Sequence, residues 1–334
     1  MKIWVFETDE WEEDACVRLG QSHDVRCERG MLDARTVATA SDAEVVTTFI
    51  NSRLTADVLA QMPSLRLIAT RSTGFDHIDM NYARDHGIVV CNVPDYGDHT
   101  VAEHSFALLL ALARHIPEAA ERTRHGDFSQ VGTCGFDLRG KTLGVVGVGR
   151  IGRRVIEIAR GFGMDVVAND IVPDPACGAR LGFRYCSLPD LLRISDIISL
   201  HVPATADTHG LLSDAEFGEM KQGGVLINTA RGNVVDTEAL VRALASGRVG
   251  AAGLDVLPEE PLTRDEAQIF RADAGSKAPD LRALVANHVL LRFPNVIVTP
   301  HIAFNTREAK ARIIETTIRN IEAFASGSPQ NKVI

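Results

Sequence analysis

A short apolar stretch that runs directly into closely spaced glycines is the feature that most constrains this chain. Residues 144–152 read Gly-Val-Val-Gly-Val-Gly-Arg-Ile-Gly, and a helical pattern follows over 153–162. This order is typical of a turn that binds a pyrophosphate. Gly147 permits the tight turn, Gly149 lets the backbone approach the phosphates, and Gly152 lets the helix pack on its strand. The phosphates would lie at the helix N-terminus, where unpaired N–H groups and the helix dipole favour negative charge.

The residues after this helix narrow the choice of ligand. A second apolar stretch, 164–170, ends in Asp170, at the spacing of about 20 residues where a carboxylate binds the ribose hydroxyls of a dinucleotide. Ile171 and Val172 follow with no adjacent arginine, so a 2′-phosphate would be repelled. The glycine spacing alone could be an ordinary turn, since the chain has 27 glycines. Strand, turn, helix, strand and acid in this order favour NAD over NADP.

Strands and helices alternate along most of the chain, which predicts parallel sheets. The chain has 334 residues, enough for two cores. We therefore expect an α/β protein with a doubly wound NAD-binding domain and a second domain. The expected buried strands are 2–6, 45–48, 67–70 and 89–91 in one domain, and 143–146, 165–168, 197–200, 225–228, 251–255 and 296–299 in the other.

Two long helical patterns flank the second set of strands. One covers 100–124, with Gly97 and Asp98 before it as turn and cap, and the other covers 306–324. The later helix has no further strand to join in its own sheet, so we expect it to pack back on the first domain. Residues 263–294 are mixed in charge and are expected to be irregular.

These helices predict the domain limits. The first domain would be discontinuous, 1–99 with 301–334, and would bind substrate, and the NAD-binding domain would cover 100–300. A cleft between them is expected at the carboxyl ends of the strands.

The bulk composition limits the class of protein. A hydrophobic content of 45% with a mean hydropathy of +0.02 is that of a soluble globular protein. The net charge of −9 comes without basic runs among aromatics, so nucleic acid is not an expected partner. The N-terminus begins as a strand without a signal peptide, and the apolar run 106–113 is too short to cross a membrane. The sequence predicts a cytoplasmic protein that does not bind membranes.

Cysteine and histidine spacings give no sign of a metal site. His99, Glu103 and His104 are spaced one residue too widely for an HxxEH motif, and no metal is predicted. The cysteines form no CxxC pair, which is typical of reduced thiols that pack in a cytosolic enzyme. They are Cys16, Cys27, Cys91, Cys134, Cys177 and Cys186.

Polar motifs follow several predicted strands, where this type of sheet places its ligands. With two motifs of the first domain, they resemble the D-isomer-specific 2-hydroxyacid dehydrogenases over essentially the whole chain. Tyr96, the pair Gly135-Phe136 and the ending His301-x-Ala-Phe304 are closest to the D-lactate dehydrogenase branch. The resemblance implies two Rossmann-like domains, the substrate domain being flavodoxin-like. The motifs are 71–79, 93–96, 201–203, 228–236, 253–261 and 299–304.

Three ionisable residues suit the reduction of a 2-oxoacid. Arg231 would bind the carboxylate with two parallel hydrogen bonds, although a surface ion pair is the alternative. His301 would supply the proton near neutral pH, a role selected among eleven histidines by the resemblance. Glu260 would orient the imidazole and raise its pKa. Glu259 is adjacent, but the position just before Pro261 matches the family.

The resemblance also implies cofactor and substrate contacts. Asp255 would approach the nicotinamide end, and the backbone N–H groups of Thr73 and Gly74 would hold the substrate carboxylate. Tyr96 and Phe304 would line the pocket for the substrate side chain, with core packing as the alternative. The expected cofactor contacts are Gly147, Gly149, Arg150, Ile151, Gly152, Asp170, Val202, Pro203, Thr208, Thr229, Ala230, Arg231 and Asp255. The expected substrate contacts are Thr73, Gly74, Tyr96, Arg231, His301 and Phe304.

The function that these features predict is an NAD-dependent D-2-hydroxyacid dehydrogenase acting on a small 2-oxoacid, with pyruvate and D-lactate as the first choice. Glyoxylate, hydroxypyruvate, phosphite and aryl 2-oxoacids are alternatives. A second class is an NAD(H)-sensing binding protein, because the fold also serves transcriptional corepressors. The family's members are typically homodimers joined through the NAD-binding domain, and the apolar helix 100–116 is compatible with such an interface.

Overall fold

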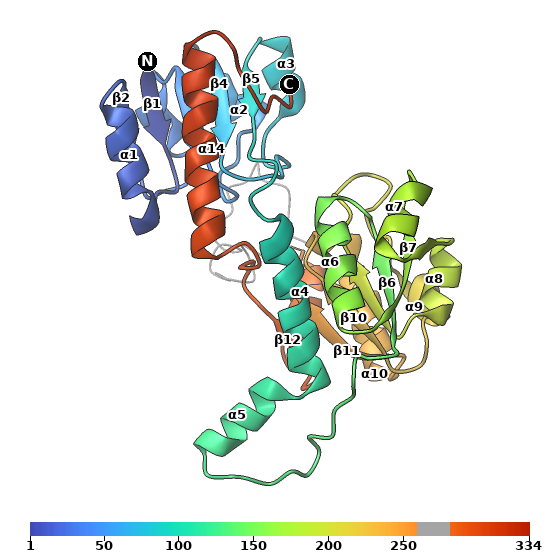
Figure 1. Cartoon of the computed structure of the whole chain (residues 1–334). Helices are drawn as coiled ribbons and strands as arrows, with labels where there is room; N and C mark the ends of the chain where they lie inside the picture. The colour runs from blue at the N-terminus through green and yellow to red at the C-terminus, as the bar shows by residue number, and fades with distance from the viewer. Residues whose placement is uncertain (259–280) are drawn as a thin grey trace. The chain divides into compact units, whose positions relative to one another are not determined.

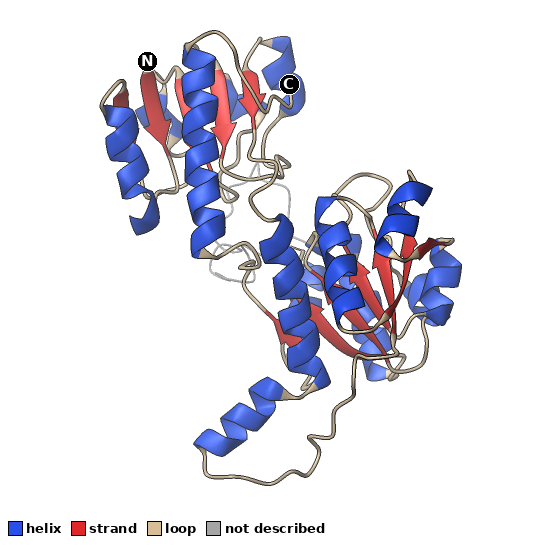
Figure 2. Ribbon diagram, viewed as in Figure 1, coloured by secondary structure: helices blue, strands red, loops and turns tan. Residues whose placement is uncertain are grey.

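The computed structural model describes residues 1–258 and 281–334 (Figure 1). The chain divides into two units, Met1–Tyr96 with Asn305–Ile334 and Gly97–Phe304. Each unit has a parallel sheet with helices on both faces (Figure 2). The predicted α/β class is confirmed.

The sheet of the first unit has the strand order β2-β1-β3-β4-β5, with every pair parallel. This is the flavodoxin-like order. Four of its strands were predicted. Strand β2 was not, because it lies at the edge of the sheet and all but one of its residues are exposed. The strands are β1 (Lys2–Val5), β2 (Asp24–Cys27), β3 (Val45–Thr48), β4 (Leu67–Thr70) and β5 (Val89–Cys91).

Helices cover both faces of this sheet. On one face lie α1 (Glu13–Gly20) and α14 (Arg307–Ala325), whose Ile318 and Ile321 are buried against β1, β3 and β4. As expected, α14 therefore packs on the first sheet, in front of which it lies in Figure 1. The last residues bond to β5, with Lys332 opposite Cys91. The other helices are α2 (Ala56–Leu59), α3 (Met80–Asp85) and the 3-10 turns η1 (Glu10–Glu12) and η2 (Val37–Ala40).

The second sheet has the order β12-β11-β10-β9-β6-β7-β8, again parallel throughout. The six predicted strands are present, and β8 is a further edge strand of two residues. The direction of winding reverses between β6 and β9, where doubly wound sheets bind ligands. The strands are β6 (Thr142–Val146), β7 (Asp165–Asn169), β8 (Arg184–Tyr185), β9 (Ile197–Leu200), β10 (Gly224–Asn228), β11 (Val249–Leu254) and β12 (Val296–Val298).

Two apolar cores lie on opposite faces of this sheet. One is formed with α4 (Asp98–Ala113), α6 (Arg150–Gly161) and α7 (Pro175–Leu181). The other is formed with α8 (Leu188–Ile194), α9 (Asp214–Glu219), α10 (Thr237–Ala245) and α13 (Leu281–Leu290). The expectation of an irregular stretch over 263–294 is wrong where α13 lies. Its part before residue 281 is outside the described residues.

The single long helix predicted over 100–124 is also wrong. Helix α4 ends at Ala113, and α5 (Ile116–Arg124) begins after His115, whose φ of 51° is left-handed. No residue of α5 is buried, and the helix projects away from the sheet of its unit (Figure 1). The chain returns at Phe136, whose N–H donates to the Ala113 carbonyl at 3.0 Å. Residues 114–135 thus form an arm, and the bond between Phe136 and Ala113 joins its two ends.

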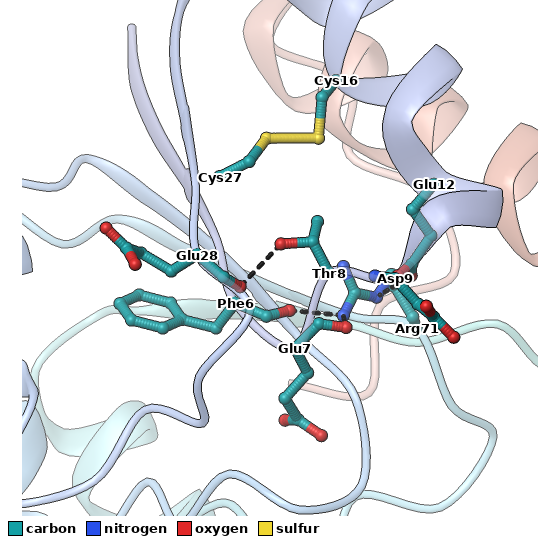
Figure 3. The surroundings of a disulfide bond; sticks show 9 residues. All are labelled: Phe6, Glu7, Thr8, Asp9, Glu12, Cys16, Cys27, Glu28 and Arg71. Carbon is teal, nitrogen blue, oxygen red and sulfur yellow. Dashed lines mark hydrogen bonds and ion pairs between the residues drawn. A yellow bond between two sulfur atoms is a disulfide. The ribbon is translucent and has the colours of Figure 1, made fainter.

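The cysteines correct a third expectation. Cys16 of α1 and Cys27 at the end of β2 form a disulfide (Figure 3), so the prediction of reduced thiols is wrong for this pair. Cys91, Cys134, Cys177 and Cys186 are free. Burial raises the pKa of Cys91 to about 11. No helix in the described parts of the chain has both the length and the apolar character to cross a membrane.

Candidate active site

The register of the second sheet brings the predicted motifs to one edge. Leu200 of β9 lies opposite both Val146 of β6 and Asn228 of β10. Leu254 of β11 in turn lies opposite Asn228 and Val298. These strands end level with one another, so the residues that follow them form a row. In the order of the sheet the row is Asp170, Gly147, His201, Thr229, Asp255 and Thr299.

The glycine turn after β6 has the tight turn and the close helix packing that its spacing predicts, and the predicted approach of Gly149 to the phosphates stays a prediction. Gly147 has φ of +93°, and a Cβ there would lie 2.6 Å from the His201 carbonyl oxygen. A Cβ at Gly152 would lie 2.1 Å from the Gly147 oxygen, so the helix can pack only on glycine. A Cβ at Gly149 would meet no described atom within 4 Å, and this residue gives α6 no side-chain cap. Gly149, at the N-terminus of α6, therefore has open space beside it, which suits a pyrophosphate.

Asp170 lies against this turn. Its carboxylate accepts the N–H of Val148 at 2.6 Å and that of Val172 at 2.9 Å. The acid predicted to bind a ribose is thus fixed beside the predicted phosphate turn. Arg150, at the start of α6, forms an exposed ion pair with Asp98 at 2.9 Å, and Ile151 packs on the core beneath. These residues fit a dinucleotide.

The turn after β9 carries Val202, Pro203 and Thr208. The Thr208 hydroxyl donates to the Pro203 carbonyl at 2.6 Å and accepts the Thr205 N–H at 2.8 Å. Val202 packs against the core, and Pro203 is exposed. These expected cofactor contacts therefore lie one strand away from the glycine turn.

The turn after β10 presents Arg231. Asn228 closes the turn twice, because its side-chain oxygen accepts the Ala230 N–H and its side-chain nitrogen donates to the Arg231 carbonyl, both at 3.0 Å. Thr229 is 8% exposed. A Cβ at Gly232 would lie 2.1 Å from the Leu257 carbonyl carbon, so this turn packs tightly on the chain leading to residue 258. Glu260 itself lies outside the described residues.

The turn after β12 presents His301 in a left-handed conformation, with φ of 55°. Its N–H donates to the Asp255 carbonyl at 3.0 Å. The Asp255 carboxylate, 1% exposed, accepts the N–H groups of Ile302 and Ala303, each at 2.9 Å, and the Thr299 hydroxyl at 2.6 Å. Burial alone would raise the pKa of Asp255, but these bonds and one from His104 lower it.

Both oxygens of Asp255 therefore bind the turn that carries His301, an arrangement that the sequence did not predict. The predicted contact of Asp255 with the nicotinamide stays a prediction. His104, Ser105 and Thr299 were also missed as parts of this site, and His104 was considered only as a metal ligand. Their partners lie far away in the sequence, so no local spacing could reveal them. Phe304, half-buried, ends this unit.

The first unit holds the remaining predicted residues. Thr73 and Gly74 follow β4, where the Thr73 hydroxyl donates to the Val93 carbonyl and Asn92 donates to the Thr73 carbonyl, both at 2.8 Å. The Tyr96 carbonyl accepts two bonds from Arg312 of α14. Thr73, Gly74 and Tyr96 thus lie in loops that side-chain hydrogen bonds hold in place.

A buried arginine fixes the start of the Thr73 loop. Arg71, 3% exposed, pairs with Glu12 at 3.0 Å and donates to the carbonyls of Phe6 and Glu7 (Figure 3). Glu12 directly precedes α1. The loop after β4 is therefore tied to the end of β1 and to the start of α1.

Comparisons with known proteins show which family this chain resembles. Residues 106–303 match the family model described as D-isomer specific 2-hydroxyacid dehydrogenase, NAD binding domain. The D-lactate dehydrogenase of Escherichia coli is 35% identical over 98% of both chains. The glyoxylate reductase of Aeropyrum pernix is 40% identical over 88% of this chain and 84% of its own. The structure of D-lactate dehydrogenase from Aquifex aeolicus with NAD and lactic acid superimposes with a TM-score of 0.87, at 36% identity, over 98% of this chain and 96% of that one.

Proposed function

Because this chain belongs to the D-isomer-specific 2-hydroxyacid dehydrogenases, NAD-dependent oxidoreductases that act on CH–OH groups, we propose that it interconverts pyruvate and D-lactate. Relatives named D-lactate dehydrogenase support this substrate. Glyoxylate is the second candidate, since relatives named glyoxylate reductase match as well.

The observation that carries the proposal is the row of level strand ends. It puts the Arg231 turn and the His301 turn on the same edge of the sheet as the glycine turn after β6. A cation, an imidazole and a dinucleotide turn on one edge are what the reduction of a 2-oxoacid requires.

Arg231 binds the substrate carboxylate in this proposal. The planar guanidinium offers two parallel N–H donors that match the two carboxylate oxygens. Its Nη1 donates to the Ala230 carbonyl at 2.8 Å, which limits the directions in which the guanidinium can turn. The substrate is thereby oriented with its C2 carbonyl at a fixed angle to the sheet edge.

His301 holds the proton that the substrate oxygen gains or loses. In the reduction the imidazolium donates a proton to the oxygen on C2, and in the oxidation the neutral ring accepts it. Glu260 accepts a hydrogen bond from the other ring nitrogen in this proposal, and so favours the charged imidazole and fixes its orientation.

NAD is held by the glycine turn, by Asp170 at the ribose and by the turn of Val202, Pro203 and Thr208. When bound, its nicotinamide supplies the hydride for C2 or accepts it from C2. Thr73 and Gly74 of the first unit give a second grip on the carboxylate, and Tyr96 and Phe304 contact the substrate side chain.

The test of the substrate is NADH oxidation with pyruvate, glyoxylate, hydroxypyruvate and phenylpyruvate, and NAD⁺ reduction with phosphite. We expect the highest kcat/KM with pyruvate and only D-lactate as product. A higher value with glyoxylate would replace the first choice by the second. NADH binding without turnover of any of these compounds would instead indicate a nucleotide-sensing protein.

The test of the site is Arg231→Lys. Lysine cannot form the two parallel bonds, so the variant should lose about 1.5 to 3 kcal/mol of transition-state stabilisation, or about 10-fold to 150-fold in kcat/KM. Arg242→Lys is the matched control, since Arg242 forms a two-bond pair with Asp214 on the exposed face of α10. Unchanged kcat/KM in the Arg231 variant would remove this residue from the mechanism.

The proposal includes a homodimer joined through the second unit. The arm of residues 114–135 exposes three apolar side chains, Ile116 at 56%, Phe128 at 79% and Val131 at 79%. Arg122 stiffens the arm by donating to the Val131 carbonyl at 2.7 Å. Large apolar side chains on a stiff projection are typical of a surface covered by another chain.

A further inference from the structure

Two consecutive residues of α4 reach the two turns that carry Arg231 and His301. His104 Nε2 lies 3.0 Å from the Thr299 hydroxyl, and the Ser105 hydroxyl lies 2.9 Å from that of Thr229. The helix can come this close because β11 has Gly253 beneath it, where a Cβ would lie 3.0 Å from that of Leu108. One helix thus contacts two strand ends that are distant in sequence.

The His104 contact has a defined direction. The Thr299 hydroxyl has a single proton, and the 2.6 Å bond to the Asp255 carboxylate uses it. The Thr299 oxygen must then accept from His104, so Nε2 carries a hydrogen. The same Nε2 lies 3.4 Å from the Asp255 carboxylate. His104 therefore supports the Asp255 carboxylate, which binds the His301 turn.

The Asp255 carboxylate in turn stabilises an unfavourable backbone conformation at His301. His301 is a non-glycine residue at φ of 55°, a conformation that costs free energy unless its surroundings enforce it. The bonds from Ile302 and Ala303 to Asp255 enforce it. A change at His104 acts on His301 through Thr299 and Asp255.

The direction of the Ser105 contact can be assigned in the same way. The Ser105 hydroxyl donates to the Val101 carbonyl of its own helix at 2.9 Å. Its oxygen therefore accepts the proton of Thr229, which directly precedes the Ala230–Arg231 turn. A change at Ser105 frees the first residue of the turn that presents Arg231.

We propose that His104 and Ser105 are positioning residues, which keep the Arg231 and His301 turns at a fixed separation by tying both to one rigid helix. The inference rests on the proposed roles of Arg231 and His301. A substrate held by its carboxylate must meet the imidazole at its carbonyl oxygen, so a shift of about 1 Å between the turns lowers the rate by about 100-fold.

The test compares His104→Leu, His104→Gln and Ser105→Ala in the full chain. Leucine removes the donor to Thr299, and we expect kcat to fall 10-fold to 100-fold while the Kd for NADH, from fluorescence titration, changes less than 2-fold. Glutamine keeps an N–H donor at nearly the same reach, so it should recover kcat to within about 3-fold of the parent. Ser105→Ala should raise KM for the 2-oxoacid by about 3-fold to 10-fold with a smaller change in kcat.

His99→Leu is the matched control, a histidine on the exposed side of the same helix, and its kinetics should not change. Thermal unfolding of each variant separates positioning from folding. If His104→Leu does not fold, His104→Asn, whose amide is too short to reach Thr299, takes its place. A parental kcat with a lowered Tm would overturn the inference, and so would equal kcat in the leucine and glutamine variants. If Arg231→Lys and His301→Asn also keep full activity, the proposed function has failed.

Discussion

The imidazole of His201 carries the clearest pH dependence in the described chain. His201 follows β9, where its backbone N–H donates to Val146. Its Nε2 lies 2.8 Å from the Ser199 hydroxyl, and its Nδ1 is sealed from solvent and finds no hydrogen-bond partner among the described residues. Burial lowers the pKa of His201 to about 3. The ring is therefore neutral in the folded protein at all but strongly acidic pH.

This imidazole should weaken the fold in mild acid. An unfolded histidine has a pKa of about 6.5, so between pH 6.5 and 3 the unfolded chain binds a proton that the folded chain does not. His201 therefore does not lower the free energy of unfolding above pH 6.5. Below that pH the free energy of unfolding falls, by up to about 1.4 kcal/mol per pH unit. Urea unfolding from pH 7.5 to 4.5 should show a shallower acid loss in His201→Gln than in the parent. His209→Gln, at an exposed histidine, is the control variant. If the free energy of unfolding falls with pH at the same slope in all three proteins, His201 takes up its proton in the folded state and the prediction is wrong.

Residues of the site were predictable where chemistry is local in the sequence. Gly147 and Gly152 follow from their spacing, because a side chain at either position would clash with the backbone. The grip of Asp255 on the His301 turn could not be predicted, because a carboxylate after a strand gives no sign of which N–H groups it will meet.

Among the elements, buried strands were predictable and edges were not. The runs that form β3, β4, β9 and β10 are buried throughout, and their apolar and β-branched residues identify them. Edge strands have few apolar residues, and β2 and β8 were missed for this reason. The break between α4 and α5 has one local signal, Pro117, which fits the first turn of a new helix.

The disulfide joins two elements, and its effect is expected on stability. Cys16 and Cys27 close a short loop that links α1 to β2, and the unfolded chain loses entropy when the loop is closed. The variant with both cysteines changed to serine should be less stable by about 3 kcal/mol in urea. A reducing agent should lower the stability of the parent and not that of the variant, with Cys134→Ser as control. Six reactive thiols in the unreduced, denatured protein would contradict the pairing.

At the scale of the whole molecule, the proposed homodimer depends on the arm of residues 114–135. Phe128→Ser with Val131→Ser removes the most exposed apolar groups of the arm and should shift the protein from twice 36.2 kDa to 36.2 kDa in light scattering at micromolar concentration. Val17→Ser changes a similarly exposed residue of α1 and should leave the mass unchanged. A parent that is already monomeric, or a double variant that stays dimeric, would contradict the role of the arm.

The first unit is assembled from residues 1–96 and 305–334, and this order has a consequence for biosynthesis. A ribosome that has translated residue 304 has synthesised everything the second sheet needs, while the earlier sheet still lacks α14 and the residues that bond to β5. The nascent chain must therefore carry an unfinished N-terminal portion through the making of the whole nucleotide-binding part. Chaperones that recognise exposed apolar strands should meet this protein at its beginning, and release it only after translation is complete.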